Sequence, residues 1–417
     1  MACFILEEEK LLRNLELMRR VKNETGVHII VAFKGFAMWK AFDVVRQYLD
    51  GATASSLHEA RLCFEEMKTP AHTYAVVYFP EEFSQIIKYS SHITFNSLNQ
   101  FHTFYPKIKK RMLDVGRSTL KKNKNSTPIS CGLRINPEYS VVETELYNPG
   151  KAGSRLGIDI KLLGGTLPEG VEGLHVHCLC ESSAADTEGL LNTVEEKLGK
   201  YFSQIKWLNL GGGHLMTREG YDVEHLIRVL KNFKQRYPHL DIILEPGSAV
   251  AWNTGYLTSR VLDIVENHGI KTIITDVSFT AHMPDTLEMP YRPRIRVASG
   301  NWQPASLDSV SGKAHDVQQV TNFNLSLATH HLTLDAQHTY RIGGTSCLSG
   351  DYMEVYRFDE AVKINDTIIF EDMIHYTMVK TSTFNGVKHP SIGMIKKDGS
   401  LEIFRRFTYK DYKNRLS

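Results

Sequence analysis

One lysine is placed where its amine could act as a nucleophile. Lys34 follows the mainly apolar segment Val27–Phe33, which we predict to be a β-strand. A lysine at the end of a buried strand either extends its ammonium group into solvent or lies in a pocket. Only a pocket would lower the pKa of the amine and make it available to form a Schiff base. Both alternatives stay open from this residue alone.

Two histidines and two cysteines lie close together in the segment Leu174–Cys180. These residue types are frequent zinc ligands, but successive side chains of a strand point to opposite faces. A strand here would place the two histidines on one face and the two cysteines on the other. The four side chains could not then form one tetrahedral shell, and we expect no metal site. The imidazole of His175 could instead stack on a flat ligand ring.

Two glycine-containing segments could bind a phosphate group. Gly211, Gly212 and Gly213 are consecutive, and glycine lets backbone N–H groups approach an anion closely. A simple flexible turn is the alternative explanation. Gly247 follows a second predicted strand, where it could supply another amide. Glu245 ends that strand and, if buried, needs a cationic partner or a proton. A protonated ring nitrogen would be such a partner.

Two further candidates lie far downstream. Cys347 stands between glycine-rich turns, where it is either a reactive thiol or a small packed residue. Tyr376 follows, and then the segment Ser382–Gly386. A strand-end lysine, a stacking histidine, two glycine loops and a strand-end carboxylate are together what pyridoxal phosphate requires of a protein.

The elements that would position these residues alternate regularly. Eight apolar or β-branched segments alternate with amphipathic segments that we predict to be helices. Nearly continuous apolar strands are typical of a parallel sheet covered by helices. The pattern predicts an α/β fold with a (β/α)₈ barrel, and an open doubly wound sheet is the alternative. The predicted strands are Val27–Phe33, Gly51–Ser55, Thr73–Phe79, Ile93–Ser97, Ile129–Ile135, Leu174–Leu179, Trp207–Leu210 and Asp241–Glu245.

The pattern changes after Pro246. Shorter alternating strands separated by turn signals predict a C-terminal antiparallel β-barrel or β-sandwich domain. We expect a barrel over 22–250 and a β domain over 251–417, with 1–21 packing on the β domain. The predicted strands of this domain are Thr272–Thr275, Ala361–Ile364, Thr367–Phe370 and Leu401–Phe404.

Composition excludes several classes of protein. The formal charge of the 417 residues is +2, which disfavours a nucleic-acid partner. No apolar run is long enough to span a membrane, and the N-terminus lacks the charge order of a signal peptide. Six irregularly spaced cysteines do not suggest a disulfide framework. We expect a soluble cytoplasmic protein. The basic segment Lys107–Lys124 is interpreted as a solvated helix and loop.

The order of these residues resembles the fold-type III pyridoxal-phosphate decarboxylases, which include the ornithine, arginine and diaminopimelate decarboxylases and are related to alanine racemase. Three segments resemble the branch that acts on carboxynorspermidine and carboxyspermidine: Phe33–Trp39, Ala54–Glu59 and Cys347–Asp351. The resemblance covers essentially the whole chain. It implies decarboxylation of a carboxylated polyamine to norspermidine or spermidine.

The resemblance also implies roles for individual residues. Lys34 would form the covalent link to pyridoxal 5'-phosphate, His175 would stack on its ring, and Glu245 would pair with the ring nitrogen. Cys347 would protonate the carbon that loses the carboxylate. The phosphate group would be bound by Gly211, Gly212, Gly213 and Gly247, with Tyr376 nearby. Such enzymes are usually head-to-tail homodimers, in which Cys347 and Asp351 enter the partner's active site.

The chain departs from the family pattern at three positions. Ser248 and Cys178 stand where the family usually has an arginine and a serine. Leu348 stands where ornithine and diaminopimelate decarboxylases usually have an acid that holds the distal ammonium of the substrate. Leucine cannot hold that group, which favours a longer substrate with a secondary amine. Asp276 and Asp351 are the residues expected to hold a polyamine cation, although Asp276 could equally cap a strand end or turn.

Three other functions remain as alternatives. The chain could be a diaminopimelate or other basic amino-acid decarboxylase. It could be a regulator of the polyamine pathway with this fold and no activity, but such a protein has no reason to retain Lys34, Glu245 and Cys347 together. A racemase would need a second acid or base, commonly a tyrosine, and a loop that contains a cysteine fits decarboxylation better.

Overall fold

The chain divides into two compact units. The computed structural model describes residues 1–117, 128–288, 291–298, 314–316, 318–319 and 338–417. One unit, called here the barrel unit, is Arg13–Val250. The other, called the sheet unit, combines Met1–Leu12 with Ala251–Ser417. Residues 13–21, which were expected with the β domain, are therefore part of the barrel unit. The portion 118–124 of the predicted basic segment lies outside the described residues.

The barrel unit contains a parallel sheet that closes on itself. Its first strand is split into β2 and β3, and the order of pairing is β2-β11-β10-β9-β7-β6-β5-β4-β3. Ile30 donates its backbone N–H to Leu244 at 3.0 Å, and Val31 donates to Gly51 at 3.0 Å. The first strand thus bonds both to the last strand and to the second, which confirms the (β/α)₈ barrel and excludes an open sheet. The strands are β2 (His28–Ile29), β3 (Val31–Ala32), β4 (Ala52–Ala54), β5 (Ala71–Tyr74), β6 (Ser90–Phe95), β7 (Ser130–Asn136), β8 (Ile158–Asp159, paired with β7), β9 (Val171–His175), β10 (Trp207–Asn209) and β11 (Asp241–Leu244).

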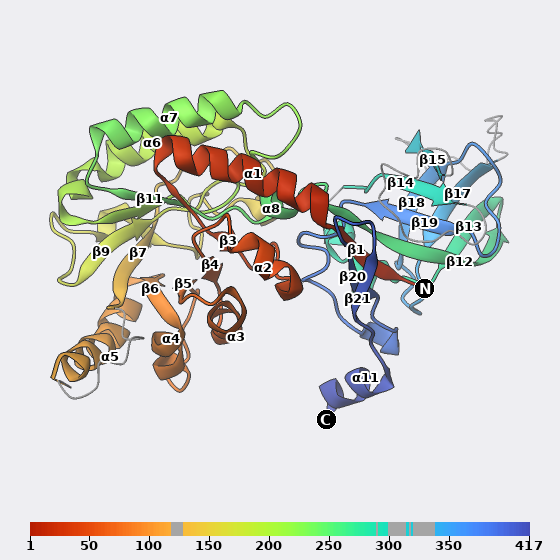
Figure 1. The fold of residues 1–417 in the computed structure, drawn as a ribbon, viewed down its shortest axis with the longest axis horizontal. Helices are drawn as coiled ribbons and strands as arrows, with labels where there is room; N and C mark the ends of the chain where they lie inside the picture. Colours follow the sequence, from red (N-terminus) through yellow and green to blue (C-terminus); the bar gives the residue numbers. More distant parts are fainter. Residues whose placement is uncertain (118–127, 289–290, 299–313, 317, 320–337) are drawn as a thin grey trace. The chain divides into compact units, whose positions relative to one another are not determined.

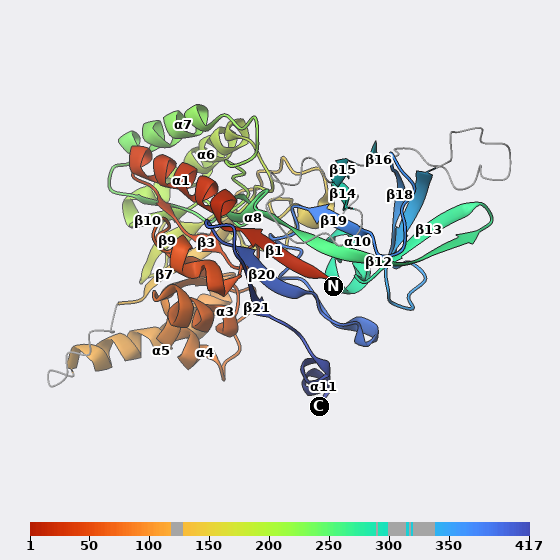
Figure 2. The same cartoon turned by 45° about the vertical axis from the view of Figure 1, so that its right-hand side comes forward.

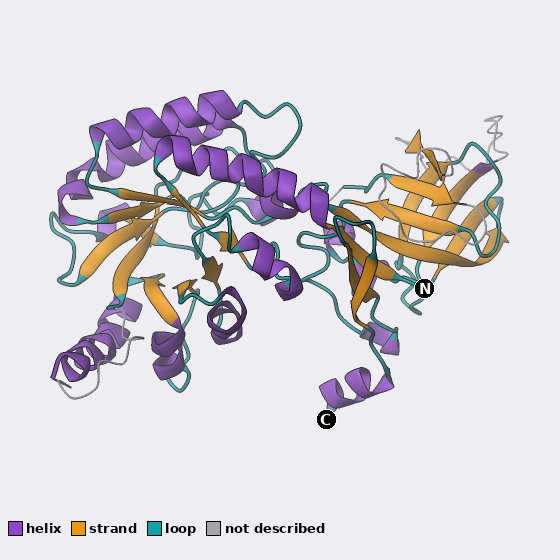
Figure 3. Ribbon diagram, viewed as in Figure 1, coloured by secondary structure: helices purple, strands orange, loops and turns teal. Residues whose placement is uncertain are grey.

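Helices surround the barrel strands, with α6 and α7 on one side of them and α4 and α5 on the other (Figure 1; helices are purple in Figure 3). In α7, Leu226, Leu230 and Phe233 are buried, while the Asp222 side chain caps the helix by accepting the N–H of His225. No helix among the described residues is long and apolar enough to cross a membrane. The helices are α1 (Glu8–Thr25), α2 (Phe42–Val45), α3 (Leu57–Leu62), α4 (Phe83–Tyr89), α5 (Leu98–Arg117), α6 (Ala184–Leu198), α7 (Val223–Arg236) and α8 (Ser248–Ala251).

Two barrel strands begin and end earlier than their apolar segments predicted. β5 ends at Tyr74 and β9 at His175, whereas the predicted strands continued to residues 79 and 179. Val76, Val77 and Phe79, which follow β5, are exposed, but other apolar residues beyond the two strands are buried. Tyr78, for example, is 3% exposed and donates its hydroxyl to the Thr73 carbonyl. Burial at this end of the barrel therefore continues past the last strand residue, and hydropathy alone does not mark the strand end.

The sheet unit is a mixed sheet rather than a purely antiparallel one. Most strand pairs are antiparallel, but β1 pairs with β20 and β13 with β17 in parallel. The predicted strand Ala361–Ile364 is a loop. Figure 2 shows the long β12–β13 hairpin in profile. The strands are β1 (Cys3–Glu7), β12 (Gly255–Asn267), β13 (Ile270–Thr275), β14 (Ile295–Ala298), β15 (Ala314–Asp316), β16 (Gln318–Gln319), β17 (Thr339–Gly343), β18 (Tyr352–Arg357), β19 (Thr367–Glu371), β20 (Ser391–Ile395) and β21 (Leu401–Arg405); the helices are α9 (Phe279–His282), α10 (Asp285–Glu288) and α11 (Tyr409–Leu416).

Candidate active site

Lys34 lies at the carboxyl end of the first barrel strand, beside a histidine. Its Nζ is 3.4 Å from Nε2 of His177. Burial within the barrel unit, followed by the nearby charge of Arg134, lowers the pKa of the Lys34 amine. The side chain itself is nevertheless exposed to solvent. An amine that is surrounded by protein yet still accessible fits the pocket alternative rather than a solvated surface lysine.

Hydrogen bonding selects the tautomer of His177. Its Nδ1 accepts the backbone N–H of Gly212 at 2.9 Å, and burial holds its pKa well below the usual range, so the ring is neutral. The ring proton must then lie on Nε2, which faces Lys34. A protonated lysine would place two donors opposite each other, whereas an unprotonated amine accepts this hydrogen bond. The geometry and the lowered pKa of Lys34 agree.

The three consecutive glycines are required by close backbone packing. A Cβ on Gly211 would lie 2.4 Å from Nδ1 of His177, one on Gly212 would lie 2.6 Å from the Glu245 carbonyl oxygen, and one on Gly213 would lie 2.2 Å from the carbonyl carbon of Leu179. Gly211 and Gly213 also have φ values of +70° and +92°. No side chain fits at these positions. The glycine segment is therefore a tightly packed loop and not merely a flexible turn.

Glu245 is buried and tied to the glycine loop by Asn209. Its Oε1 accepts the side-chain amide of Asn209 at 2.7 Å, and Oδ1 of Asn209 accepts the N–H of Gly211 at 2.8 Å. Burial raises the pKa of Glu245, while the hydrogen bonds from Asn209 and Thr53 oppose that rise. One asparagine thus orients the carboxylate and fixes the loop.

His175, which was predicted to stack on a ligand ring, lies beside the carboxylate of Glu245. Its Nε2 is 3.7 Å from Oε2 of Glu245, and burial and Arg134 keep its pKa well below the usual range. Neither ring nitrogen has a hydrogen-bond partner within the described chain. The ring instead contacts Tyr74 edge-on, with centroids 5.4 Å apart. His177, and not His175, is the histidine next to Lys34.

The residues at this position fit pyridoxal phosphate. In the described part of the chain, the ion-pair partner of Glu245 is His175, which is neutral. The buried carboxylate is therefore not paired with a fully charged cation there. A protonated ring nitrogen would supply that charge, the Lys34 amine is suited to an aldehyde, and the glycine loop is suited to a phosphate. His175, His177 and Glu245 also place three ligand atoms within 4.8 Å of one another, which could hold a metal ion. The cysteines of the same segment take no part in that set.

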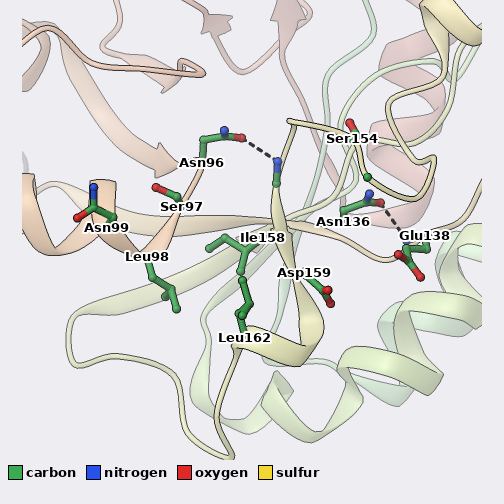
Figure 4. A pocket seen from close by; sticks show the side chains of 12 residues that line it. Asn96, Ser97, Leu98, Asn99, Asn136, Glu138, Ser154, Ile158, Asp159 and Leu162 are labelled. Atoms are coloured by element: carbon green, nitrogen blue, oxygen red, sulfur yellow. Dashed lines mark hydrogen bonds between the residues drawn. The ribbon is translucent and has the colours of Figure 1, made fainter.

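A separate pocket lies at the carboxyl ends of β6 and β7. It encloses about 480 Å³ and is lined by Asn96–Asn99, Asn136, Glu138, Gly153, Ser154, Gly157–Asp159 and Leu162 (Figure 4). Two asparagine side chains in its lining form hydrogen bonds with the surrounding loops. Asn96 Oδ1 accepts the N–H of Gly157, and Asn136 Oδ1 accepts that of Glu138. Tyr74 donates its hydroxyl to Asn96 at 2.8 Å. This bond links the pocket to the cluster around His175.

Apart from Gly247, which follows β11 in the barrel unit, the remaining predicted site residues belong to the sheet unit. Cys347 is exposed, and its backbone N–H is bonded to Asn385. Asp351 is 4% exposed and accepts two backbone N–H groups. Asp276 accepts the hydroxyl of Ser259 and the N–H groups of Arg260 and Ala2. Both carboxylates thus have bonds within their own unit.

Tyr376 has an unusual backbone conformation, with a φ of +47°. The next residue, Thr377, donates its hydroxyl to the buried Asp285 at 2.9 Å. Two neighbouring backbone amides, those of Val379 and Lys380, bond to the Tyr376 carbonyl. The structure therefore holds this tyrosine in a strained turn, a feature common at functional sites.

Four residues that lie in these clusters were not predicted as site residues from the sequence. Asn209 stands two positions before the glycine run, and His177 shares the strand face assigned to His175. Arg134 lies in a predicted strand and is 5% exposed. A single charged residue in an apolar segment does not indicate which residues it contacts. Asn385 lies in the segment Ser382–Gly386, and nothing in the sequence indicates its contact with Cys347.

Several known proteins are similar to this chain over most of its length. A family model described as "Pyridoxal-dependent decarboxylase, C-terminal sheet domain" matches residues 74–374. A carboxyaminopropylagmatine decarboxylase of Synechocystis sp. is 46% identical over 414 residues, which cover 99% of this chain and 95% of that protein. A carboxynorspermidine/carboxyspermidine decarboxylase of Campylobacter jejuni is 40% identical over 98% of this chain and 96% of its own.

A solved structure supports the same relationship. The crystal structure of carboxynorspermidine decarboxylase from Campylobacter jejuni, complexed with norspermidine, matches with a TM-score of 0.80 and 38% identity. The match covers 100% of this chain and 99% of that one. The barrel, the lysine at its mouth and relatives that align over nearly their full length lead to one conclusion: the chain belongs to the pyridoxal-dependent decarboxylase family.

Proposed function

We propose that this protein decarboxylates a carboxylated polyamine with pyridoxal phosphate bound at the mouth of the barrel unit. The strongest support is the identity of 46% and 40%, over nearly the whole chain, to two decarboxylases of carboxylated polyamine-type compounds. The exposed Leu348 agrees, because a leucine cannot pair with the terminal ammonium of a short diamino acid. Diaminopimelate decarboxylases match less well: one is 29% identical over 41% of the chain, and another is 21% identical over 67% of it.

The barrel unit supplies the groups that would hold the cofactor. Lys34 is assigned the covalent link, and the glycine loop with Gly247 is assigned the phosphate. Glu245 would keep the ring nitrogen protonated, and the bond from Asn209 favours the ionised carboxylate that this role needs. We assign packing against the ring to His177 rather than His175, because His177 is the residue beside Lys34. When bound, the cofactor accepts the electron pair left by the departing carboxylate.

Two substrate groups are compatible with the relatives. One is carboxynorspermidine and carboxyspermidine, which end in an ammonium group. The other is carboxyaminopropylagmatine, which ends in a guanidinium group and is named by the 46% identical relative. The ends differ in shape, since a planar guanidinium can form two parallel bonds to a carboxylate and an ammonium cannot. A pocket that fits one end should therefore discriminate against the other.

We further propose a homodimer in which Cys347 acts in the active site of the partner subunit as the proton donor. Its exposure within its own unit is consistent with such a role. Mixing inactive Lys34→Ala protomers with inactive Cys347→Ala protomers should restore part of the activity, because one of the two sites of a mixed dimer would be intact. No recovery after confirmed subunit exchange would reject the shared site.

A substrate panel tests the proposed reaction. Release of CO₂ should be measured from carboxynorspermidine, carboxyspermidine, carboxyaminopropylagmatine, meso-diaminopimelate and ornithine. We expect one of the first three to give the highest kcat/KM, and a preference for either of the last two would overturn the proposal. Reduction of the cofactor-loaded protein with borohydride, followed by peptide mass spectrometry, should place the adduct on Lys34. Lys40, an exposed lysine nearby in the sequence, should stay unmodified.

A further inference from the structure

The loop that contains Cys347 is held by two side chains on either side of the thiol residue. Asn385 accepts the backbone N–H of Cys347 through Oδ1 at 2.8 Å. The Asp351 carboxylate accepts the N–H of Ser346 at 3.0 Å. We propose that Asn385 and Asp351 are positioning residues that fix the thiol of Cys347 for proton transfer. The catalytic part of this inference rests on the role proposed above for Cys347.

Asn385 combines the two properties that its position requires. Its φ is +59°, in the left-handed region that few residues other than glycine and asparagine adopt readily. Its side chain also provides the acceptor for the amide of Cys347, which glycine could not. The next residue, Gly386, has a φ of +71°, so the backbone turns sharply here. An asparagine followed by a glycine satisfies both the turn and the hydrogen bond.

Asp351 uses both carboxylate oxygens to tie backbone segments together. Oδ2 accepts the N–H of Ser346, and Oδ1 accepts the N–H of Thr280 at 3.0 Å. A Cβ on Gly344 would lie 2.4 Å from the same carboxylate, so the loop closes tightly around it. Because both oxygens already have donors and the residue is 4% exposed, a structural role explains Asp351 better than a direct contact with substrate.

Both side chains are connected to one short helix. Asp351 is bonded to Thr280 of α9, and the segment that contains Asn385 is attached to α9 through Ser382, which donates its N–H to the Ala281 carbonyl at 2.7 Å. The helix itself is capped by the buried Ser278, whose hydroxyl accepts the N–H of Ala281. The thiol is therefore carried by a loop with two supports on a common, buried base.

Substitutions at Asn385 separate the hydrogen bond from the backbone conformation. Asn385→Gly keeps the left-handed turn accessible and removes the acceptor, whereas Asn385→Asp keeps an acceptor. In the cofactor-loaded enzyme without substrate, we expect Asn385→Gly to speed amide hydrogen exchange of the peptide that contains Cys347 by roughly three- to tenfold. We expect kcat to fall by a similar factor while KM stays within twofold. Asn385→Asp should retain slow exchange.

A matched control is available in the same unit. Asn365 also has a left-handed backbone, with a φ of +75°, and lies in an exposed turn. Asn365→Gly should leave exchange near Cys347 and kcat unchanged. Unchanged exchange in Asn385→Gly, or an equal change in Asn365→Gly, would overturn the inference. Because exchange needs no substrate, this arm gives a result even if the substrate panel rejects the proposed reaction.

Asp351→Asn distinguishes positioning from substrate binding. An amide can accept only one of the two N–H groups and would direct its own donor at the other. Positioning predicts faster exchange of the Cys347 peptide in the absence of substrate, together with a lower kcat. Direct binding of a substrate cation predicts a raised KM with unchanged exchange, and that result would overturn the assignment of Asp351.

Discussion

The side-chain amide of Asn209 donates a hydrogen bond of 2.7 Å to Oε1 of Glu245. The same asparagine accepts the N–H of Gly211, so the carboxylate at the end of one barrel strand and the loop after its neighbour share one support. This bond favours the ionised form of Glu245 against the effect of burial, which raises its pKa. Cofactor binding should therefore depend on Asn209 through Glu245 and the glycine loop, without a direct contact between Asn209 and the cofactor.

Asn209→Leu tests that dependence. Loss of the bond should raise the pKa of Glu245 further, so that at neutral pH a larger fraction of the carboxyl is protonated and unable to pair with a ring nitrogen. We expect the Kd for pyridoxal phosphate to rise by roughly three- to tenfold, and the loss to shrink as the pH is raised. Fluorescence titration of the apoprotein measures this. Asn232→Leu, on the exposed side of α7, is the control, and an equal effect there would contradict the assignment.

Arg134→Met should slow attachment of the cofactor to Lys34. Arg134 lies over the Tyr74 ring at 4.6 Å, and its charge is the second cause, after burial, of the lowered pKa of the lysine. Removing a positive charge stabilises the ammonium form, so the pKa of Lys34 rises and less unprotonated amine is present at neutral pH. We expect a severalfold slower rate and a pH–rate profile displaced to higher pH, measured by stopped-flow absorbance.

The control for this prediction is Arg228→Met, which removes an exposed arginine from α7. Its attachment rate and pH profile should match those of the wild type. A profile that is displaced equally in both variants, or in neither, would mean that Arg134 does not influence the lysine.

Gly212→Ala should weaken cofactor binding more than it weakens folding. Its Cβ would lie 2.6 Å from the carbonyl oxygen of Glu245, so the loop would have to move away from β11. We expect the Kd for pyridoxal phosphate to rise by at least about tenfold, since several backbone contacts would shift together. Gly199→Ala, where a Cβ meets nothing within 4 Å, should bind normally. Normal binding by Gly212→Ala would show that the loop does not contact the phosphate.

Two partly buried histidines should make the protein less stable at mildly acidic pH. The rings of His72 and His92 stack with centroids 3.8 Å apart, and burial lowers the pKa of His92 to about 4. Unfolded histidine has a pKa of about 6.5, so the unfolded chain binds a proton that the folded chain does not, and stability falls as the pH drops between these values. Between about pH 7 and about pH 5, His92 alone should account for about 2 kcal/mol of that loss.

Urea unfolding of His92→Phe measures this contribution. The variant should lose less free energy of unfolding than the wild type over the same pH range. His102→Phe, which replaces an exposed histidine on α5, should keep the full pH dependence of the wild type. If both variants retain that dependence, the stacked pair is not its source.

The sequence alone was sufficient to predict the barrel and the part of the site that strand ends determine. Parallel strands meet with their carboxyl ends at one edge, so Lys34, the glycine run and Glu245, each at the end of a predicted strand, had to come together. Three glycines in a row and a carboxylate at a buried strand end also indicate their chemistry by residue type. These inferences need only the order of the strands.

Which atoms of the site contact each other depends on where the chain leaves each strand and on how neighbouring residues pack. β9 ends at His175, and the backbone beyond it no longer follows the strand. His177 rather than His175 therefore lies beside Lys34. Likewise, an aspartate looks the same in a sequence whether it faces a ligand or a backbone amide. Only the fold decided that Asp351 bonds to Ser346 and Thr280, because those donors come from a distant helix and a tight loop.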